Sequence, residues 1–243
     1  MAQHEASLPR HFQRGLRLLV VGQIQHDQID FIEKQLARQS DIQFDRRILV
    51  DDEPAKGIEA RRAKIAQNHK ILHEKVFDFR YEYDYIIQIE GDSVLKEGTF
   101  ARLIGNLDQV PADQLGYISG IQVGRHGIYA IGAWHFNDDQ TEYESVNHKV
   151  KDGIIEVDAT GFYCLIAPIK SWLMGNCYYY DERWGPDVNW GLSLKEQGYH
   201  IYVDMGLEIG HQSTNGVIGL DNINLCQVKF KKTNGQWKYK CYE

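Results

Sequence analysis

The sequence places two carboxylates directly after an apolar segment. Residues 85–89 form a short, largely apolar run, which is typical of a strand inside a sheet. Glu90 and Asp92 follow it, separated by Gly91, the residue type whose backbone bends most freely. Two carboxylates that point the same way could form an oxygen site for Mg²⁺ or Mn²⁺ that also accepts substrate phosphate oxygens. The alternative is an ordinary polar turn, which Asp and Gly also favour.

Two later segments carry side chains that could complete such a site. His211 ends the apolar segment 207–211, and a neutral imidazole is a good further ligand for Mn²⁺, although an isolated histidine is more often structural. Asp187 follows Pro186 at the start of a helical segment. It could cap that helix and interact with its dipole, or it could act as a general base towards a substrate.

The elements that must position these residues alternate along the first half of the chain. Strands are predicted at residues 16–24, 44–50, 85–89, 116–123, 129–135, 157–167, 200–203 and 207–211. Helices are predicted at residues 27–38, 58–76, 97–107 and 188–197, and a polar loop at 137–144. The alternation predicts an α/β fold with a mostly parallel central sheet flanked by helices. Such sheets bind ligands beyond the carboxyl ends of their strands, where Glu90 and Asp92 would lie.

Composition limits the function classes. With 243 residues, 43% of them hydrophobic, the chain suits one globular domain. No apolar run is long enough to span a membrane, and the first fifteen residues contain no signal-peptide core. Four cysteines without a CxxC pair fit reduced thiols in the cytoplasm of a bacterium or a virus-infected cell, with a Cys226–Cys241 disulfide left open. The net charge of −7 argues against a surface that coats nucleic acid.

One basic segment stands apart from this acidic average. Residues 228–241 alternate charged and aromatic side chains around Asn234–Gly235, which predicts a β-hairpin with a type I′ turn. The segment contains five lysines: Lys229, Lys231, Lys232, Lys238 and Lys240. They could protect an exposed edge strand, or they could clamp an anionic acceptor.

Four short motifs, in this order, resemble the metal-dependent glycosyltransferases with the GT-A fold. The motifs are Glu90–Gly91–Asp92, the turn 158–162 (DATGF), the loop 184–189 (WGPDVN) and Gly210–His211. The resemblance covers roughly residues 16–215 and implies a single GT-A-like (Rossmann-like) domain. Residues 1–15 are then a polar N-terminal extension, and residues 216–243 a C-terminal tail with the basic hairpin.

The resemblance also implies roles for individual residues. Asp92 and His211 would ligate Mn²⁺ or Mg²⁺, and Asp187 would be the catalytic base. Donor-binding positions would be Gly22, Gln23, Asp51, Arg61, Arg62, Glu90 and Gly91. Gly161 would be an acceptor-binding position. Trp134 and Trp184 have glycines and polar loops beside them in the sequence and could also bind the acceptor, although aromatic side chains in an α/β core are more often packing. The arginines would lie near a diphosphate, because guanidinium groups pair well with phosphate oxygens.

The implied reaction moves a hexosyl or N-acetylhexosaminyl group from a UDP- or GDP-sugar to a hydroxyl acceptor. It inverts the anomeric carbon if Asp187 is the base, and it could retain the configuration if Asp187 only binds the acceptor. The basic hairpin suggests a polyanionic acceptor, such as a polymer or the hydroxymethylated DNA of a virus. Glu90 departs from the usual aspartate, and the loop at Asp187 carries one acid where many relatives have two. The alternatives are a nucleotidyltransferase that activates a sugar phosphate, and a non-catalytic sugar- or nucleotide-binding module.

Overall fold

The computed structural model describes the backbone of residues 19–22 and 47–50, and describes residues 57–124, 130–181, 183–213, 216–221 and 223–242. The first described pair of strands, β1 (Leu19–Gly22) and β2 (Arg47–Val50), is parallel. The predicted helix at 27–38 lies outside the described residues. No helix in these ranges is both long enough and apolar enough to cross a membrane.

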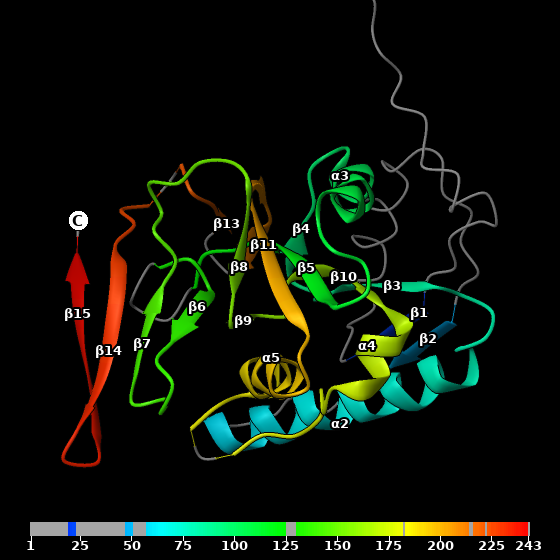
Figure 1. Ribbon diagram of the computed structural model, residues 1–243, viewed down its shortest axis with the longest axis horizontal. Helices are drawn as coiled ribbons and strands as arrows, with labels where there is room; N and C mark the ends of the chain where they lie inside the picture. Colours follow the sequence, from blue (N-terminus) through cyan, green and yellow to red (C-terminus); the bar gives the residue numbers. More distant parts are fainter. Residues whose placement is uncertain are drawn as a thin grey trace, which may run out of the picture.

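A mixed five-stranded sheet forms the centre of the molecule (Figure 1). Its order is β3 (Tyr85–Ile89), β10 (Cys164–Pro168), β5 (Leu115–Ile121), β11 (His200–Glu208) and β8 (Ile154–Val157). Strand β10 runs antiparallel to both of its neighbours, and β11 is parallel to β5 but antiparallel to β8. The predicted GT-A-like (Rossmann-like) fold with a mostly parallel sheet is therefore wrong.

Strand β10 is buried on both faces, which explains why the sequence predicted a parallel sheet. A continuous apolar strand is usually read as part of a parallel sheet, because antiparallel strands commonly keep one face in water. In β10, Cys164, Leu165, Ile166 and Ala167 are all fully buried although the strand is antiparallel. Hydrophobic periodicity alone carries no information about the direction of such a strand.

Helices pack on the two faces of this sheet and divide the core (Figure 1). The helices α2 (Ile58–Asp78), α4 (Ile169–Met174) and α5 (Pro186–Glu196) cover one face, and α3 (Thr99–Asn106), followed by the 3-10 turn η2 (Leu107–Gln109), covers the other. Because side chains alternate along a strand, Tyr117 of β5 joins the first core and its neighbour Ile118 joins the second. The described helices α2, α3 and α5 lie within a few residues of those predicted from the sequence.

Two smaller sheets adjoin the central one. The first has three strands, β13 (Gly216–Ile218), β12 (Gly210–Ser213) and β4 (Ser93–Val94). The second has five antiparallel strands in the order β15 (Gln236–Tyr242), β14 (Gln227–Thr233), β7 (Glu142–Ser145), β6 (Ala133–Phe136) and β9 (Ala159–Thr160). Strand β7 occupies the end of the segment predicted as a polar loop, so that prediction is wrong there.

The C-terminal hairpin forms at the residues where the sequence predicts it. Thr233 pairs with Gln236, and Asn234 and Gly235 have positive φ angles of 51° and 77°, as a type I′ turn requires. Strand β14 also pairs with β7, so the hairpin extends the second five-stranded sheet. Figure 1 shows β14 and β15 at one end of the molecule, far from α3.

A buried histidine in α2 makes stability depend on pH. His69 stacks on Phe162 with 3.9 Å between ring centroids, and burial lowers the pKa of its imidazole from 6.5 to about 3. Between these two values the unfolded chain binds a proton that the folded chain does not. The free energy of unfolding should therefore fall as pH decreases through this interval, by up to about 1.4 kcal/mol per pH unit from this residue.

The substitution His69→Phe is expected to remove that contribution while keeping an aromatic ring against Phe162. Urea unfolding of both proteins at several pH values between 6.5 and about 3 measures it. The variant should lose less stability per pH unit than the wild type. Equal slopes in the two proteins would show that His69 does not control acid sensitivity.

Candidate functional site

The pairing of two short strands brings Asp92 and His211 together. In the antiparallel pair β4–β12, Ser93 lies opposite His211, and the carbonyl of Asp92 accepts a hydrogen bond of 2.8 Å from the Gln212 amide. The side chain of Asp92 thus lies beside that of His211, with 3.4 Å between Asp92 Oδ2 and His211 Nε2. Residues 119 positions apart in the sequence therefore meet at one place.

The second ring nitrogen of His211 fixes the orientation of the imidazole. Nδ1 lies 3.0 Å from the carbonyl oxygen of Val123, an acceptor, so Nδ1 carries the proton in the neutral ring and Nε2 presents its lone pair towards Asp92. His211 is buried, and the Asp92 side chain is 29% exposed. An imidazole held by a carbonyl, beside a partly exposed carboxylate, is an arrangement that proteins use to bind divalent metal ions. The described residues contain no cluster of three or more potential metal ligands, so this pair offers at most two side chains to an ion.

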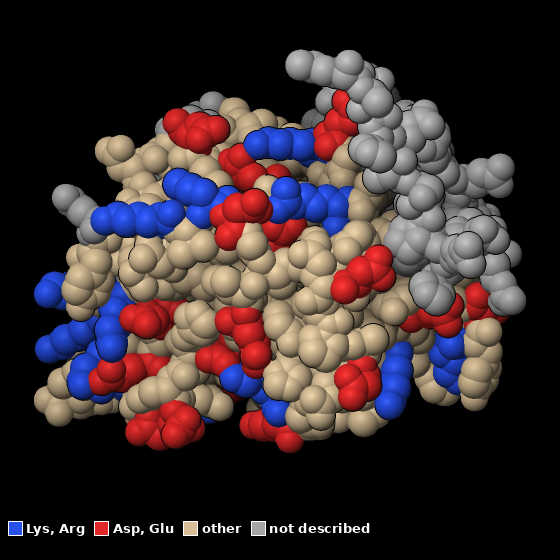
Figure 2. All heavy atoms as spheres, turned by 45° about the horizontal axis from the view of Figure 1, so that its top comes forward, with Lys and Arg blue, Asp and Glu red and all other residues tan. Residues whose placement is uncertain are grey.

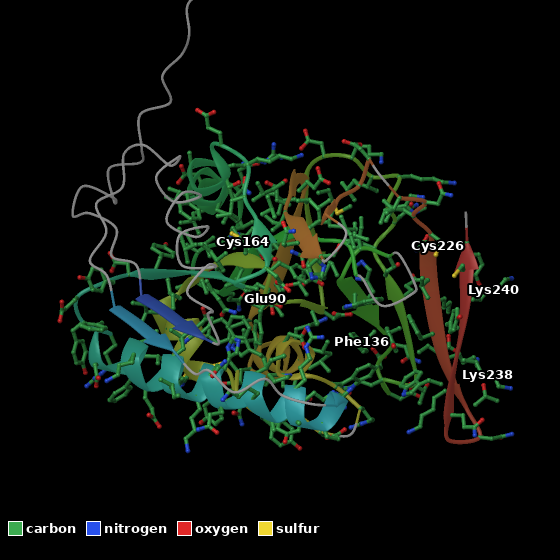
Figure 3. The ribbon with its side chains drawn as sticks, turned by 180° about the vertical axis from the view of Figure 1, so that it is seen from behind. Glu90, Phe136, Cys164, Cys226, Lys238 and Lys240 are labelled. Carbon is green, nitrogen blue, oxygen red and sulfur yellow. The ribbon has the colours of Figure 1, made fainter. Side chains whose placement is uncertain are left out.

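Glu90 lies at the same edge of the central sheet. Its amide donates a 2.9 Å hydrogen bond to the carbonyl of Tyr163, and the Ser93 hydroxyl donates a 2.8 Å hydrogen bond to the same carbonyl. Figure 3 shows Glu90 near the centre of the molecule, with Phe136 between it and the hairpin in this view. The three residues of the Glu90–Asp92 turn are thus anchored to the chain that enters β10.

Gly91 does not adopt a backbone conformation that only glycine favours. Its φ angle is not in the left-handed region, and a Cβ added to it would meet nothing within 4 Å. Backbone freedom or close packing therefore does not require glycine at this position.

Asp187 lies in the first turn of α5, where its charge is near the positive end of the helix dipole. Gly185 is the N-cap and no side chain caps the helix, so the predicted capping role of Asp187 is wrong. Burial raises the pKa of its carboxyl, and this effect outweighs the hydrogen bonds from the amides of Val188 and Asp187 and the charges of Arg62 and Arg61, which all act in the opposite direction. A carboxylate with a raised pKa that remains partly exposed can accept a proton from a substrate hydroxyl.

Tyr163 connects the Glu90 and Asp187 sides of the site. Burial raises its pKa well above the ordinary value, and the charges of Asp187 and Glu90 both add to this shift, so both carboxylates lie close to the phenol. The phenol donates a 3.0 Å hydrogen bond to the carbonyl of Gly132. A Cβ at Gly161 would overlap the Tyr163 ring, which explains the glycine there by packing. Sequence reasoning missed Tyr163, although it directly follows Gly161 and Phe162.

The two predicted arginines lie on the first turns of α2. Arg62 donates a 3.3 Å hydrogen bond to the carbonyl of Asp181 and lies 3.6 Å from the carboxylate of Glu59. Because the charges of Arg61 and Arg62 lower the pKa of Asp187, α2 presents positive charge to this part of the site. Of the other donor positions, Gly22 ends β1, for which only the backbone is described, and Gln23 and Asp51 lie outside the described residues.

The predicted acceptor tryptophans belong to one aromatic cluster on the second five-stranded sheet. The ring centroid of Tyr143 lies 5.5 Å from that of Trp134 and 5.0 Å from that of Trp184. The two faces of the Tyr143 ring stack on Phe136 at 5.2 Å and on Phe230 at 4.4 Å, so neither face is free for a ligand. Two tryptophans pack against the side of this stack of three rings. Trp184 contacts Phe136 and Tyr143, and Trp237 of β15 contacts Tyr143.

Trp184 is thereby a packing anchor for the loop that carries Asp187. It is 7% exposed, and its indole N–H has no acceptor among the described residues. The ring centroids of Trp237 and Trp184 are 5.5 Å apart, so the C-terminal hairpin directly supports residues 183–185, which lead into α5. The cluster links the hairpin to the candidate base.

The opposite face of the same sheet is charged. Lys229 and Lys231 of β14 both form ion pairs with Glu142 of β7, the first at 3.4 Å. Lys238 and Lys240 follow on the exposed strand β15. Figure 2 shows basic side chains gathered at the hairpin end of the molecule with acidic side chains beside them. The predicted lysine clamp is thus partly neutralised within the protein.

Comparison with known proteins assigns no family to the chain. No family model matches it, and no curated protein matches it. Among solved structures, the crystal structure of A197 from STIV is similar at 14% identity and a TM-score of 0.44, over 85% of this chain and 90% of that one. A likeness this weak carries no conclusion about activity.

Proposed function

We propose that the chain is a divalent-metal-dependent glycosyltransferase that uses a nucleotide-diphosphate sugar. The observation that carries the proposal is the approach of Asp92 Oδ2 to His211 Nε2, with the imidazole held by the Val123 carbonyl. One carboxylate and one imidazole suit Mn²⁺ or Mg²⁺ bound mainly by substrate phosphates and water, because these ions often take few protein ligands in nucleotide sites. Such an ion would hold the diphosphate and stabilise the leaving group.

The remaining residues fit the parts that such a transfer needs. Arg61 and Arg62 supply positive charge for a diphosphate, and Glu90 can bind the ribose or a metal-bound water. Asp187, with its raised pKa, can take the proton of an acceptor hydroxyl as the oxygen attacks the anomeric carbon. An attack of this kind on the face opposite the leaving group inverts the configuration.

The acceptor is a separate part of the proposal. On the charged face of the sheet, a polyanionic acceptor such as hydroxymethylated DNA would have to use Lys238 and Lys240, because Glu142 already pairs with Lys229 and Lys231. These lysines lie on the face of the sheet opposite Trp237. A neutral sugar or polymer acceptor needs no such contact.

Donor binding can be tested before any acceptor is known. Thermal unfolding of the chain with UDP-, GDP-, CMP- and TDP-sugars, each with and without Mn²⁺, should reveal one donor that raises Tm only with the ion. At a donor concentration of about 100 times Kd, the rise should be roughly 5–10 °C. It should be absent in Asp92→Asn and retained in Asp113→Asn, which removes an exposed carboxylate before β5. If no nucleotide sugar stabilises the wild type in a metal-dependent way, the proposal is wrong.

A further inference from the structure

Two cysteines meet at the open end of the C-terminal hairpin. Val228 of β14 lies opposite Cys241 of β15, and side chains alternate along a strand, so Cys226 shares a face with Cys241 at the diagonal position. The two side chains are near enough for Cys241 to raise the pKa of the Cys226 thiol, and neither cysteine is in a disulfide. Figure 3 shows Cys226 at the end of the hairpin away from its turn, beside β15.

The other two cysteines of the chain have no such environment. Cys164 and Cys177 are fully buried, and burial raises the pKa of both thiols, that of Cys177 to about 12. Cys226 is partly exposed and Cys241 is exposed. Thiol chemistry with a solute is therefore confined to the hairpin pair, because only there can a reagent reach sulfur.

We propose that Cys226 and Cys241 form a reversible intramolecular disulfide by exchange with a small-molecule disulfide such as glutathione disulfide. The exposed Cys241 attacks first as its thiolate, forms a mixed disulfide and releases one glutathione. Cys226 then attacks the sulfur of Cys241 and releases the second glutathione. The protein loses two protons and two electrons, and the glutathione disulfide gains them as two glutathione thiols.

The exposure of the two thiols gives this order of steps, because Cys241 is exposed and Cys226 only partly exposed, so a dissolved disulfide reaches Cys241 first. Burial first, and then the hydrogen bond and charge of Cys241, raise the pKa of Cys226 to about 11, so Cys226 is a weak nucleophile while its partner is a free thiol or thiolate. In the mixed disulfide the Cys241 sulfur carries no negative charge and can no longer accept a hydrogen bond from the Cys226 thiol as a thiolate. Its contribution to the shift then disappears, and Cys226 loses its proton more easily as the resolving thiol.

The bond would tie the end of β15 to the chain that enters β14. The closed loop includes Trp237, which packs against Trp184, a residue shortly before the first residue of α5 in the sequence. Oxidation would thus restrain the strand that supports the loop of the candidate site. The chemistry of the thiol pair is independent of the proposed glycosyl transfer.

The test uses the full chain, reduced, freed of reductant and then incubated with glutathione disulfide. Intact mass should fall by two hydrogens, and peptide mapping should link Cys226 to Cys241. Cys226→Ser should instead stop with one glutathione on Cys241, and Cys241→Ser should react far more slowly. Tm of the wild type should rise by roughly 5 °C on oxidation, because the crosslink closes a loop of about 15 residues, and should return with dithiothreitol.

Two outcomes would overturn the proposal. Wild-type protein that retains glutathione on Cys241 without closing the bond would show that Cys226 cannot reach it. A disulfide-linked dimer as the main product would show that the thiols pair between molecules.

Discussion

Replacing Asp187 with asparagine is expected to lower kcat for sugar transfer by roughly 10²- to 10⁴-fold, the contribution typical of general-base catalysis. Asparagine has nearly the same shape and keeps an oxygen that can accept from the Val188 amide, but it cannot take the acceptor proton. The donor-dependent rise in Tm should remain, because the metal pair and the arginines are unchanged. Initial rates of nucleoside diphosphate release with a saturating donor and acceptor measure the effect.

The pH dependence of the wild type gives an independent check on this role. The base must be deprotonated to act, so kcat/KM should fall on the acid side as Asp187 becomes protonated. Because burial raises the pKa of this carboxyl, the fall should begin at a higher pH than for an ordinary aspartate. The residual activity of Asp187→Asn should lack this acid limb. If Asp187→Asn keeps a kcat within a few-fold of the wild type and its kcat/KM still falls at acid pH, another group is the base.

Loss of either member of the metal pair is the second large effect. Asp92→Asn removes the charged oxygen that lies 3.4 Å from His211 Nε2, and His211→Gln removes the imidazole. Each is expected to lower metal-dependent turnover by roughly 10²- to 10³-fold, the loss typical of removing one electrostatic contact to the developing charge. EDTA should reduce wild-type turnover to the level of the variants and have little further effect on them.

Structural damage has to be separated from loss of the ion. His211 also bonds to the Val123 carbonyl, so His211→Gln should be compared with the wild type by circular dichroism and by Tm without ligand. The double variant should lose little more than either single variant, because both residues would act on one ion. Full turnover of both single variants in EDTA would exclude a metal role for the pair.

The structure brings together Asp92 and His211, two residues singled out from the sequence, although the sequence prediction of the sheet was wrong. Asp92 and His211 each follow an apolar segment, which is a local signal, and the structure brings them together through β4–β12. Strand β4 has only two residues, so no periodicity could have revealed that pairing. The antiparallel direction of β10 could not be predicted for a related reason. A strand that is buried on both faces has no alternation of polar and apolar residues, so its sequence resembles that of a strand in a parallel sheet.

Contacts between distant segments account for most of what the sequence missed. Gly161 lacks a side chain where the Tyr163 ring lies, and a Cβ there would overlap the ring. The two residues are close in the sequence, but their residue types do not predict this contact. The stack of Phe136, Tyr143 and Phe230 spans three strands, one of which was read as loop. Trp184, predicted at the acceptor, packs against Tyr143 of that stack and so holds the segment that leads into α5. Contacts with distant segments determine such roles, and the local sequence around each residue does not show which contacts it will make.

The division of the second five-stranded sheet into an aromatic and a charged side restricts how its length can vary. Adding or deleting a single residue within β14 would turn Lys229 or Lys231 inwards against Tyr143 and send Phe230 into water, because neighbouring side chains point in opposite directions. A change of two residues restores the parity, and extra residues at Asn234–Gly235 leave it untouched. Loop grafts or peptide tags introduced into this chain should therefore be placed at that tip.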